Sequence, residues 1–456
     1  MKHRSLLQAS ALLAPLAFAT SAWATNGYFT HGVGTHNKAM AGAGTASPTQ
    51  SIDAANNPAA AAVVGEKWDV GLALFSPRRS YETSDSMLNG QFGSFTIGPN
   101  DLDSDNEWFP IPYVAKNWKL DNGQALAFSF YGRGGMNTEW RGGTATFDPD
   151  GPGPAPVMTL PGTYGDGTAG VDLTQAFMEL AWAGSVNSFS WGIAPIIAIQ
   201  AFEATGVRSF AGFTETFAAS GGTQFPKYLS NNGHDYSFGY GIKLGGLWSA
   251  TDNLRLGLAY QSILYMTEFD DYEDLYVGGG EFDIPSSLRA GVSWDVTPGF
   301  TLHFDIEEIY YEDVDSISNP IQNLFQCPTA GFGGTSTAHC IGGSRGPGFG
   351  WEDITIYKLG ANWTLGGMPQ WTFRAGYSNT DQPIPDDQVT FNILAPGIME
   401  DHFTVGASYE RSNGHEMSFS FMYAPEQSVS GANTFDPTQT IEFEMTQYEF
   451  EFAYSW

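Results

Sequence analysis

Apolar and polar residues alternate along most of this chain, one position at a time. The last nine residues, YEFEFAYSW (448–456), carry an aromatic side chain at every second position, and Glu449 and Glu451 lie between them. The same alternation recurs in NLRLGLAYQ (253–261) and in FTLHFDIE (300–307). Because successive side chains of a β-strand point to opposite faces, this pattern predicts an all-β chain whose strands have one apolar and one polar face.

Alternation alone fits both a soluble β-sandwich and a membrane β-barrel, so the connections between the strands have to distinguish them. About fourteen strands are predicted, and short joints alternate strictly with long ones. The short joints are 120–124, 184–188, 249–253, 296–299, 365–370 and 411–415, and the long ones are 84–106, 135–168, 206–233, 269–281, 314–350, 379–399 and 425–439. An antiparallel barrel has tight turns at one rim and long loops at the other, whereas a Greek-key sandwich has no reason to alternate in this way.

Tryptophan positions also favour the barrel. Three tryptophans, Trp108, Trp140 and Trp351, lie near the long-loop ends of predicted strands. Those near the short-joint ends are Trp68, Trp118, Trp182, Trp191, Trp248, Trp294, Trp363, Trp371 and Trp456. Indole rings prefer the interface between membrane and water, so two girdles are expected of a barrel in lipid. The predicted fold is therefore a transmembrane antiparallel β-barrel of about fourteen strands.

In such a barrel the segment 448–456 is the last strand, with its aromatic face toward lipid and its glutamates toward the lumen. Just before it, Ile441, Phe443 and Met445 occupy the opposite phase from Tyr448. Either a bulge shifts the phase, or the strand rises above the bilayer at this point.

The N-terminus has the pattern of a cleaved export signal. A basic start precedes the apolar run 11–19, and residues 22–24 (AWA) form an A-x-A-like cleavage site, so residues 1–24 are interpreted as a signal peptide. No later apolar stretch reaches the roughly 18 residues that a spanning helix needs. If the exported chain enters a membrane, it is expected to span it as a closed barrel.

Charge and cysteine content exclude several other classes of protein. The formal net charge is −30, which excludes general nucleic-acid binding because that needs a basic surface. Cys327 and Cys340 lie in one Gly-rich stretch, where a local disulfide is expected in an oxidising compartment. With only His339 beside them they make no four-ligand set, and the sequence has no phosphate-binding loop. Neither a metal nor another cofactor is therefore expected.

Residues 25–65 precede the first predicted strand and differ from the rest of the chain. The segment is small, polar and rich in Gly and Ala, with neither a strand period nor a clear long helix. It is too short for a domain, and a fourteen-stranded barrel is wide enough to need filling. The segment is therefore predicted to fold inside the barrel as a hatch, and residues 66–456 to form the barrel with its long extracellular loops.

Several short motifs, taken in order and at their spacing, are similar to one known family. NNPAA (56–60) matches the family's Asn-Pro-Ala motif at Asn57, Pro58 and Ala59. The other similar segments are EWFPIPYVA (107–115), FSFYGRGG (128–135), FRAGYSNTDQPIPDD (373–387) and DHFTVGASYE (401–410). On these segments the chain resembles the FadL-type outer-membrane transporters of hydrophobic compounds, which include long-chain fatty-acid and aromatic-hydrocarbon channels.

The resemblance implies a fourteen-stranded barrel in the outer membrane of a Gram-negative bacterium, closed by an N-terminal hatch. Extracellular loops would catch the ligand, which would pass to an internal site near the N-terminus and leave sideways at a kink in the third strand. The implied partners are the hydrophobic ligand, outer-membrane lipid and lipopolysaccharide, and the assembly machinery that recognises an aromatic C-terminus; the barrel would be a monomer. The Cys327–Cys340 loop differs from the corresponding loops of the fatty-acid members, so the resemblance does not identify the substrate.

Gly132, Gly134 and Gly135 interrupt the third predicted strand, and two interpretations are open. Glycine within a strand marks a bulge or a close backbone approach, so a barrel-corner bulge is the simpler one. The resemblance favours the other, in which the wall lacks a stretch here and a hydrophobic molecule reaches the bilayer through the gap.

Two further sets of residues are candidates for ligand contact. Phe210, Phe213 and Phe217 in one long loop have helical spacing, and either pack on one another over the barrel mouth or form one wall of a capture groove. Basic residues on the lumen phase either pair with lumen carboxylates or receive a substrate carboxylate. The basic residues are Lys243, Arg255, Arg289, Lys358 and Arg374, and the carboxylates include Asp295, Asp305 and Glu307.

The predicted function is passive uptake of hydrophobic small molecules through the outer membrane, by loop capture, hatch movement and lateral exit, and not an enzymatic reaction. A general porin, which needs an open polar lumen, is one alternative. An outer-membrane enzyme acting on lipids is another, although Ser344 in GGSRG (342–346) follows no apolar strand and opens no helix. The long loops could also serve as an adhesin or a phage receptor.

Overall fold

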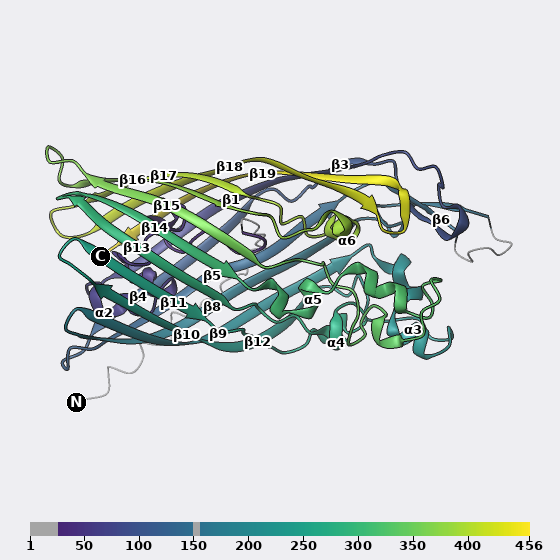
Figure 1. Cartoon of the computed structure of the whole chain (residues 1–456), viewed down its shortest axis with the longest axis horizontal. Helices are drawn as coiled ribbons and strands as arrows, with labels where there is room; N and C mark the ends of the chain where they lie inside the picture. The colour runs from purple at the N-terminus through teal and green to yellow at the C-terminus, as the bar shows by residue number, and fades with distance from the viewer. Residues whose placement is uncertain (1–25, 149–155) are drawn as a thin grey trace, which may run out of the picture.

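The strands pair with their neighbours in sequence into a closed antiparallel ring (Figure 1). The computed structural model describes residues 26–148 and 156–456, so the predicted signal peptide, residues 1–24, and the first residue of the predicted hatch lie outside the described residues. The ring consists of β1 (Trp68–Thr83), β4 (Phe109–Lys119), β5 (Ala125–Trp140), β8 (Ala169–Val186), β9 (Phe189–Thr205), β10 (Asp235–Ser249), β11 (Leu254–Gln261), β13 (Ser287–Thr297), β14 (Phe300–Ile309), β15 (Ile354–Thr364), β16 (Trp371–Thr380), β17 (Asp401–Glu410), β18 (Glu416–Asn433) and β19 (Asp436–Ser455).

The sheet that forms this ring contains sixteen strands, but two of them are short additions beside the wall. β3 (Asp101–Asp103) pairs with β1, and β12 (Tyr265–Met266) pairs with β10. The remaining fourteen strands close on themselves, because β1 pairs with β19 and β10 pairs with β11. The predicted fourteen-stranded antiparallel barrel is therefore confirmed.

The two rims differ as the joint lengths predicted. Tight turns join the strands at one rim, where the C-terminus lies, and the long connections gather at the other (Figure 1). One connection differs from the prediction of a long loop over 425–439. β18 continues to Asn433 and β19 begins at Asp436, so these strands form an extended hairpin closed by a two-residue turn.

The phase change in the last strand has a different cause from a bulge. β19 pairs with β1 in unbroken register from Asp69–Ser455 to Thr83–Ile441, and the irregularity on its other side lies within β18. Phe443 faces inward and is fully buried, whereas Glu444 is exposed on the outside. This pattern supports the other interpretation, in which the strand rises above the bilayer at this point.

Exposure along the wall follows the predicted division into a lipid face and a lumen face. In β19, Phe452 is 59% exposed on the outside, whereas Glu449 and Glu451 are buried on the inside. The predicted loop-end tryptophan girdle is wrong at two of its three positions: Trp108 is exposed, but Trp140 and Trp351 are fully buried. Both indoles pack inside the barrel mouth, where their N–H groups find carbonyl partners.

The long loops carry short helices and a small sheet of their own. The sheet has the order β2 (Phe95–Ile97), β6 (Thr144–Phe147), β7 (Met158–Pro161). The loop helices are η2 (Gln91–Gly93), η3 (Arg208–Phe213), α3 (Glu215–Ala219), η4 (Asp270–Tyr272), α4 (Val277–Gly280), η5 (Tyr311–Asp313), α5 (Asp315–Ser318), η6 (Ile321–Gln326), η7 (Thr337–His339), η8 (Asp386–Gln388) and α6 (Val389–Asn392). Among the residues described, none of the helices is both long and apolar enough to cross a membrane.

The N-terminal segment folds against the inner wall through α1 (Thr35–Lys38), η1 (Ser51–Ala55) and α2 (Ala60–Val63), and nearly all of it is buried (Figure 1). Its backbone approaches the wall where inward positions are glycine. A Cβ atom on Gly376 would lie 2.1 Å from the carbonyl carbon of Met40, and one on Gly192 would lie 2.3 Å from that of Pro58. Glycine at these positions lets the segment fill the lumen without displacing the strands.

Candidate functional site

The wall of the barrel is interrupted between β4 and β5. The ladder that joins them ends at the pair Tyr113–Tyr131, although β5 continues to Trp140. Pro110 and Pro112 lie in β4 beyond this pair, and a proline has no N–H to donate to a neighbouring strand. This part of β4 is therefore an edge.

The bulge predicted from the glycines is present in β5, directly after the last pair of the ladder between β4 and β5. The register between β5 and β8 shifts between Gly132 and Gly134. Tyr131 below the bulge and Trp140 above it are both buried, although their spacing along an unbroken strand would put them on opposite faces. The phase change turns Trp140 into the barrel, which explains why it is absent from the girdle.

The N-terminal segment occupies the edge of β5 above the bulge. Phe29 forms an antiparallel bridge with Gly134, and the N–H of Gly135 donates to the carbonyl of Tyr28 at 3.1 Å. The N–H of Thr30 donates to the carbonyl of Arg133 at 3.0 Å, and the Arg133 guanidinium lies 4.6 Å from the centre of the Phe29 ring. The residues at the break are thus paired with the hatch instead of with β4.

Two other contacts anchor the segment in the lumen. The Nζ of Lys38 lies 2.9 Å from Glu449 Oε2 and 2.8 Å from Glu451 Oε2, so the glutamates of the last strand neutralise a buried hatch lysine. In the Asn-Pro-Ala motif, the Asn57 side chain donates to the carbonyl of Gly246 at 3.2 Å and accepts from the N–H of Ala59 at 3.1 Å. Pro58, between them, packs against backbone at two inward glycines of β9 and β10.

The lumen charges are largely paired with one another. Glu307 contacts three cations: Arg133 at 3.1 Å, Arg289 at 2.7 Å and Lys358 at 2.5 Å. Lys243 pairs with Glu179 at 2.6 Å.

Of three other charged side chains in the lumen, one is in an ion pair and the other two bond to uncharged groups. Arg255 pairs with Asp295 at 2.6 Å, as predicted. Asp305 accepts from the N–H of Thr45 in the hatch instead of from a basic side chain. Arg374 faces the Ser408 hydroxyl.

An apolar pocket lies among the long loops, and we call it the outer pocket. It encloses ≈ 60 Å³, several times the roughly 10–15 Å³ that one water molecule needs. Burial raises the pKa of the Tyr276 phenol well above its ordinary value, so this side chain is uncharged at neutral pH. The lining residues are Val171, Phe202, Val207, Phe210, Leu229, Leu275, Tyr276, Ser316, Ile341, Pro347, Gly348, Phe349, Phe391 and Leu394. None of these is charged at neutral pH.

Phe210 connects this pocket to an aromatic cluster from several loops. Its ring centre lies 5.3 Å from that of Phe95, 5.4 Å from Tyr164 and 5.3 Å from Phe391. The side chain is 2% exposed and also lines the outer pocket. Both interpretations of this residue, packing over the mouth and walling a ligand site, are therefore compatible with its position.

Phe213 shares η3 with Phe210, and their ring centres are 6.4 Å apart, but Phe217 lies on a separate helix. η3 ends at Phe213, and a new helix, α3, begins after Thr214, whose side chain accepts from the N–H of Phe217. Phe213 packs near Phe435, whereas Phe217 packs against Phe225 at 5.1 Å. The prediction of a single helix is wrong because the Thr214 cap starts a separate one.

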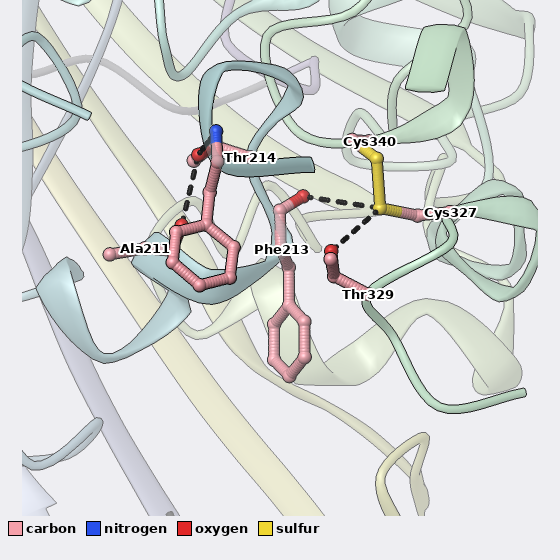
Figure 2. Close-up of a disulfide and its surroundings, with 7 residues drawn as sticks. Ala211, Phe213, Thr214, Cys327, Thr329 and Cys340 are labelled. Carbon is pink, nitrogen blue, oxygen red and sulfur yellow. Dashed lines mark hydrogen bonds between the residues drawn. A yellow bond between two sulfur atoms is a disulfide. The ribbon is translucent and has the colours of Figure 1, made fainter. Parts of the chain in front are cut away.

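Cys327 and Cys340 form a disulfide within one loop, and this disulfide lies beside Phe213 of another loop (Figure 2). Cys327 Sγ lies 3.7 Å from the carbonyl oxygen of Phe213. The next residue after the second cysteine, Ile341, donates its N–H to the same carbonyl at 2.9 Å and lines the outer pocket. The disulfide therefore lies directly behind one wall of the pocket.

Sequence reasoning missed several residues that the fold brings to these sites. Arg133 lies within the glycine run at the bulge, and a charge between two glycines in a strand was a usable signal. Lys38 and Glu179 gave no such signal, because their partners lie on distant strands. Most residues of the outer pocket lie in irregular loops, where hydrophobic and polar positions do not alternate with a regular period.

Comparison with known proteins identifies a family whose members resemble this chain. A family model described as outer membrane protein transport protein (OMPP1/FadL/TodX) matches residues 169–454. No curated protein sequence matches the chain.

Solved structures with the same fold cover nearly the whole chain. The toluene transporter TodX of P. putida has 14% identity and a TM-score of 0.58, over 93% of this chain and 98% of that one. The toluene transporter TbuX of Ralstonia pickettii has 14% identity and a TM-score of 0.56, over 93% and 98%. A FadL homologue of Pseudomonas aeruginosa has 15% identity and a TM-score of 0.55, over 94% and 98%. Because the sequence identities are this low, the similarity to these structures shows only a shared fold.

Proposed function

The chain belongs to the outer membrane transport protein family OMPP1/FadL/TodX, and we propose that it takes up small, uncharged hydrophobic molecules across the outer membrane of a Gram-negative bacterium. The observation that carries this proposal is the outer pocket, which is apolar and is lined mainly by the long loops, together with Val171 of β8 and Phe202 of β9. A hydrophobic molecule gains free energy on leaving water for such a site.

The ligand class is inferred from charge. The lining of the outer pocket contributes no charged side chain, and the lumen cations Arg133, Arg289 and Lys358 all contact Glu307. At these three cations, a fatty-acid carboxylate would have to compete with that buried glutamate. An uncharged hydrophobic molecule fits these properties better, and two of the similar structures are described as toluene transporters.

Lateral exit into the bilayer is the proposed route. The ladder between β4 and β5 ends at Tyr113–Tyr131, and the edge of β5 above it pairs with hatch residues near Phe29. Movement of this hatch strand would uncover the edge and let a hydrophobic molecule pass into lipid without crossing an aqueous pore. Net flux would follow the gradient.

Ligand binding is tested with Phe210→Ala. Truncating this pocket residue should weaken binding of the fluorescent hydrophobe N-phenyl-1-naphthylamine by at least about tenfold. Phe225→Ala is the matched control, because Phe225 is 72% exposed and contacts only the outlying Phe217 ring in the described aromatic pairs. Displacement of the dye by toluene but not by oleate would support the ligand class; equal binding by both variants would refute the site.

The exit route is tested with the double variant Gly132→Val and Gly134→Val. A Cβ atom on Gly134 would lie 2.9 Å from the Tyr28 ring, so the bulged wall cannot keep its present form. Uptake should stop, while the barrel still assembles. Uptake at the wild-type rate would rule out exit at this break, and large ionic currents from the wild-type protein in planar bilayers would favour a general porin instead.

A further inference from the structure

Two short strips of chain separate the outer pocket from a second cavity. Phe349 and Leu394 line the outer pocket, whereas Trp351 and residues 395–397 line a smaller cavity of ≈ 10 Å³. We call the strips 349–351 and 391–397 the partition. Each strip thus contributes side chains to both cavities.

The second cavity, which we call the inner cavity, lies beside the break in the wall. Its lining includes Tyr28, whose carbonyl accepts from Gly135 at the edge of β5. It also includes Met136 and Thr138, which follow the bulge in β5. The partition therefore borders both the outer pocket and the cavity beside the break.

Asn392 joins the two strips of the partition. Its Oδ1 accepts from the indole N–H of Trp351 at 2.7 Å, and its Nδ2 donates to the carbonyl of Phe349 at 2.6 Å. Nδ2 also donates to the carbonyl of Gln388 at 2.8 Å. Asn392 is fully buried, so each of these bonds would be costly to lose in the closed state.

β5 holds the same strip from the other side. The indole N–H of Trp140 donates to the carbonyl of Ile393 at 2.9 Å, and the hydroxyl of Thr138 donates to the carbonyl of Leu394 at 2.7 Å. The strand that carries the bulge therefore also holds the partition, so that movement of β5 and movement of the strip are mechanically linked.

We propose that the partition is a gate between the outer pocket and the wall break, and that Asn392 is the positioning residue that holds it closed. This inference rests on the proposed function. An uncharged hydrophobic ligand has no group that could replace the bonds of Asn392, so it passes only when the strips separate. The gate therefore retains ligand in the outer pocket and sets the rate of its release toward the bilayer.

The test compares Asn392→Ala and Trp351→Phe with the control Asn323→Ala, whose amide donates to the carbonyl of Arg345 and which lines neither cavity. N-phenyl-1-naphthylamine binding is measured in detergent, and its transfer into the bilayer of proteoliposomes is followed by fluorescence. Trp351→Phe keeps an aromatic side chain but replaces the indole by a smaller ring and removes one hydrogen bond, which should speed transfer about fivefold, and Asn392→Ala should speed it more. Dye affinity should change by less than about twofold in both.

Hydrogen exchange of peptides covering 389–397 gives a readout that does not depend on transport. Exchange should be faster in Asn392→Ala than in the wild type and unchanged in Asn323→Ala. Wild-type transfer rates in both gate variants, with folding and dye binding intact, would overturn the gate. If the wild-type protein neither binds nor transfers dye, the proposed function fails, and faster exchange would then still support Asn392 as the residue that holds the partition.

Discussion

Glu307 illustrates how single side chains hold this lumen together. Its carboxylate contacts Arg133 of the bulge, Arg289 of β13 and Lys358 of β15, and all four groups are buried. Arg133 and Lys358 also donate to carbonyls of the hatch, at Thr30 and His31. The glutamate thereby joins three strands and the hatch through one charge.

Replacing Glu307 by Gln should destabilise the barrel strongly. The substitution leaves three buried cations without their shared carboxylate, and breaking a buried pair typically costs about 3–5 kcal/mol. The temperature at which the barrel loses its compact mobility on SDS gels should fall. Asp295→Asn is the control, because its pair with Arg255 is partly exposed; an equal effect in both variants would contradict the special role of Glu307.

At the scale of elements, the hatch and the wall fit because glycine lines the lumen where the hatch backbone approaches it. Gly376 of β16 faces Met40, and Gly192 of β9 faces Pro58. Glycine here is a packing requirement, since any side chain would take the space of the hatch backbone. The Asn-Pro-Ala motif occupies one of these contacts, which gives its residues a structural role.

Gly376→Val should displace the hatch and open the lumen to ions. The added Cβ would lie 2.1 Å from the Met40 carbonyl carbon, so the hatch backbone must move. Planar-bilayer recordings should change from nearly silent to stepwise ionic currents. Gly366→Val is the matched control, because a Cβ atom there meets nothing within 4 Å. A silent Gly376→Val barrel would mean that the hatch tolerates the side chain.

At the scale of the whole molecule, the outer pocket exists only because loops from distant parts of the chain meet over the mouth. Val171 lies on β8, Ile341 follows the disulfide, and Leu394 belongs to the segment after α6. The disulfide lies within this cover and not in the wall, which is built by strand pairing. A substitution that loosens the loops should therefore weaken ligand binding without lowering the thermal stability of the barrel.

The double variant Cys327→Ser and Cys340→Ser tests this separation. Without the disulfide the loop that carries Ile341 has to be ordered on binding, which should lower affinity for N-phenyl-1-naphthylamine about threefold to tenfold. The thermal stability of the barrel should not change, and reduction of the wild-type protein should give the same result. A barrel that fails to assemble, or unaltered dye affinity, would contradict the assignment.

The sequence by itself determined the barrel, its number of strands and the side of the wall on which YEFEFAYSW places each residue. These features follow from local rules, because a period of two fixes the faces of a strand and joint length separates the rims. The proximity of Cys327 and Cys340 was likewise readable from their place in one short loop.

Only the tertiary structure decided which charges meet and where the cavities lie. Lys38 and Glu449 are 411 positions apart, and their contact depends on the closure of the ring and on how the hatch folds within it. Trp140 turns inward because a bulge changes the phase of β5, and Asn392 reaches Trp351 because two loops cross over the mouth. Such contacts depend on register and closure, which no local pattern contains.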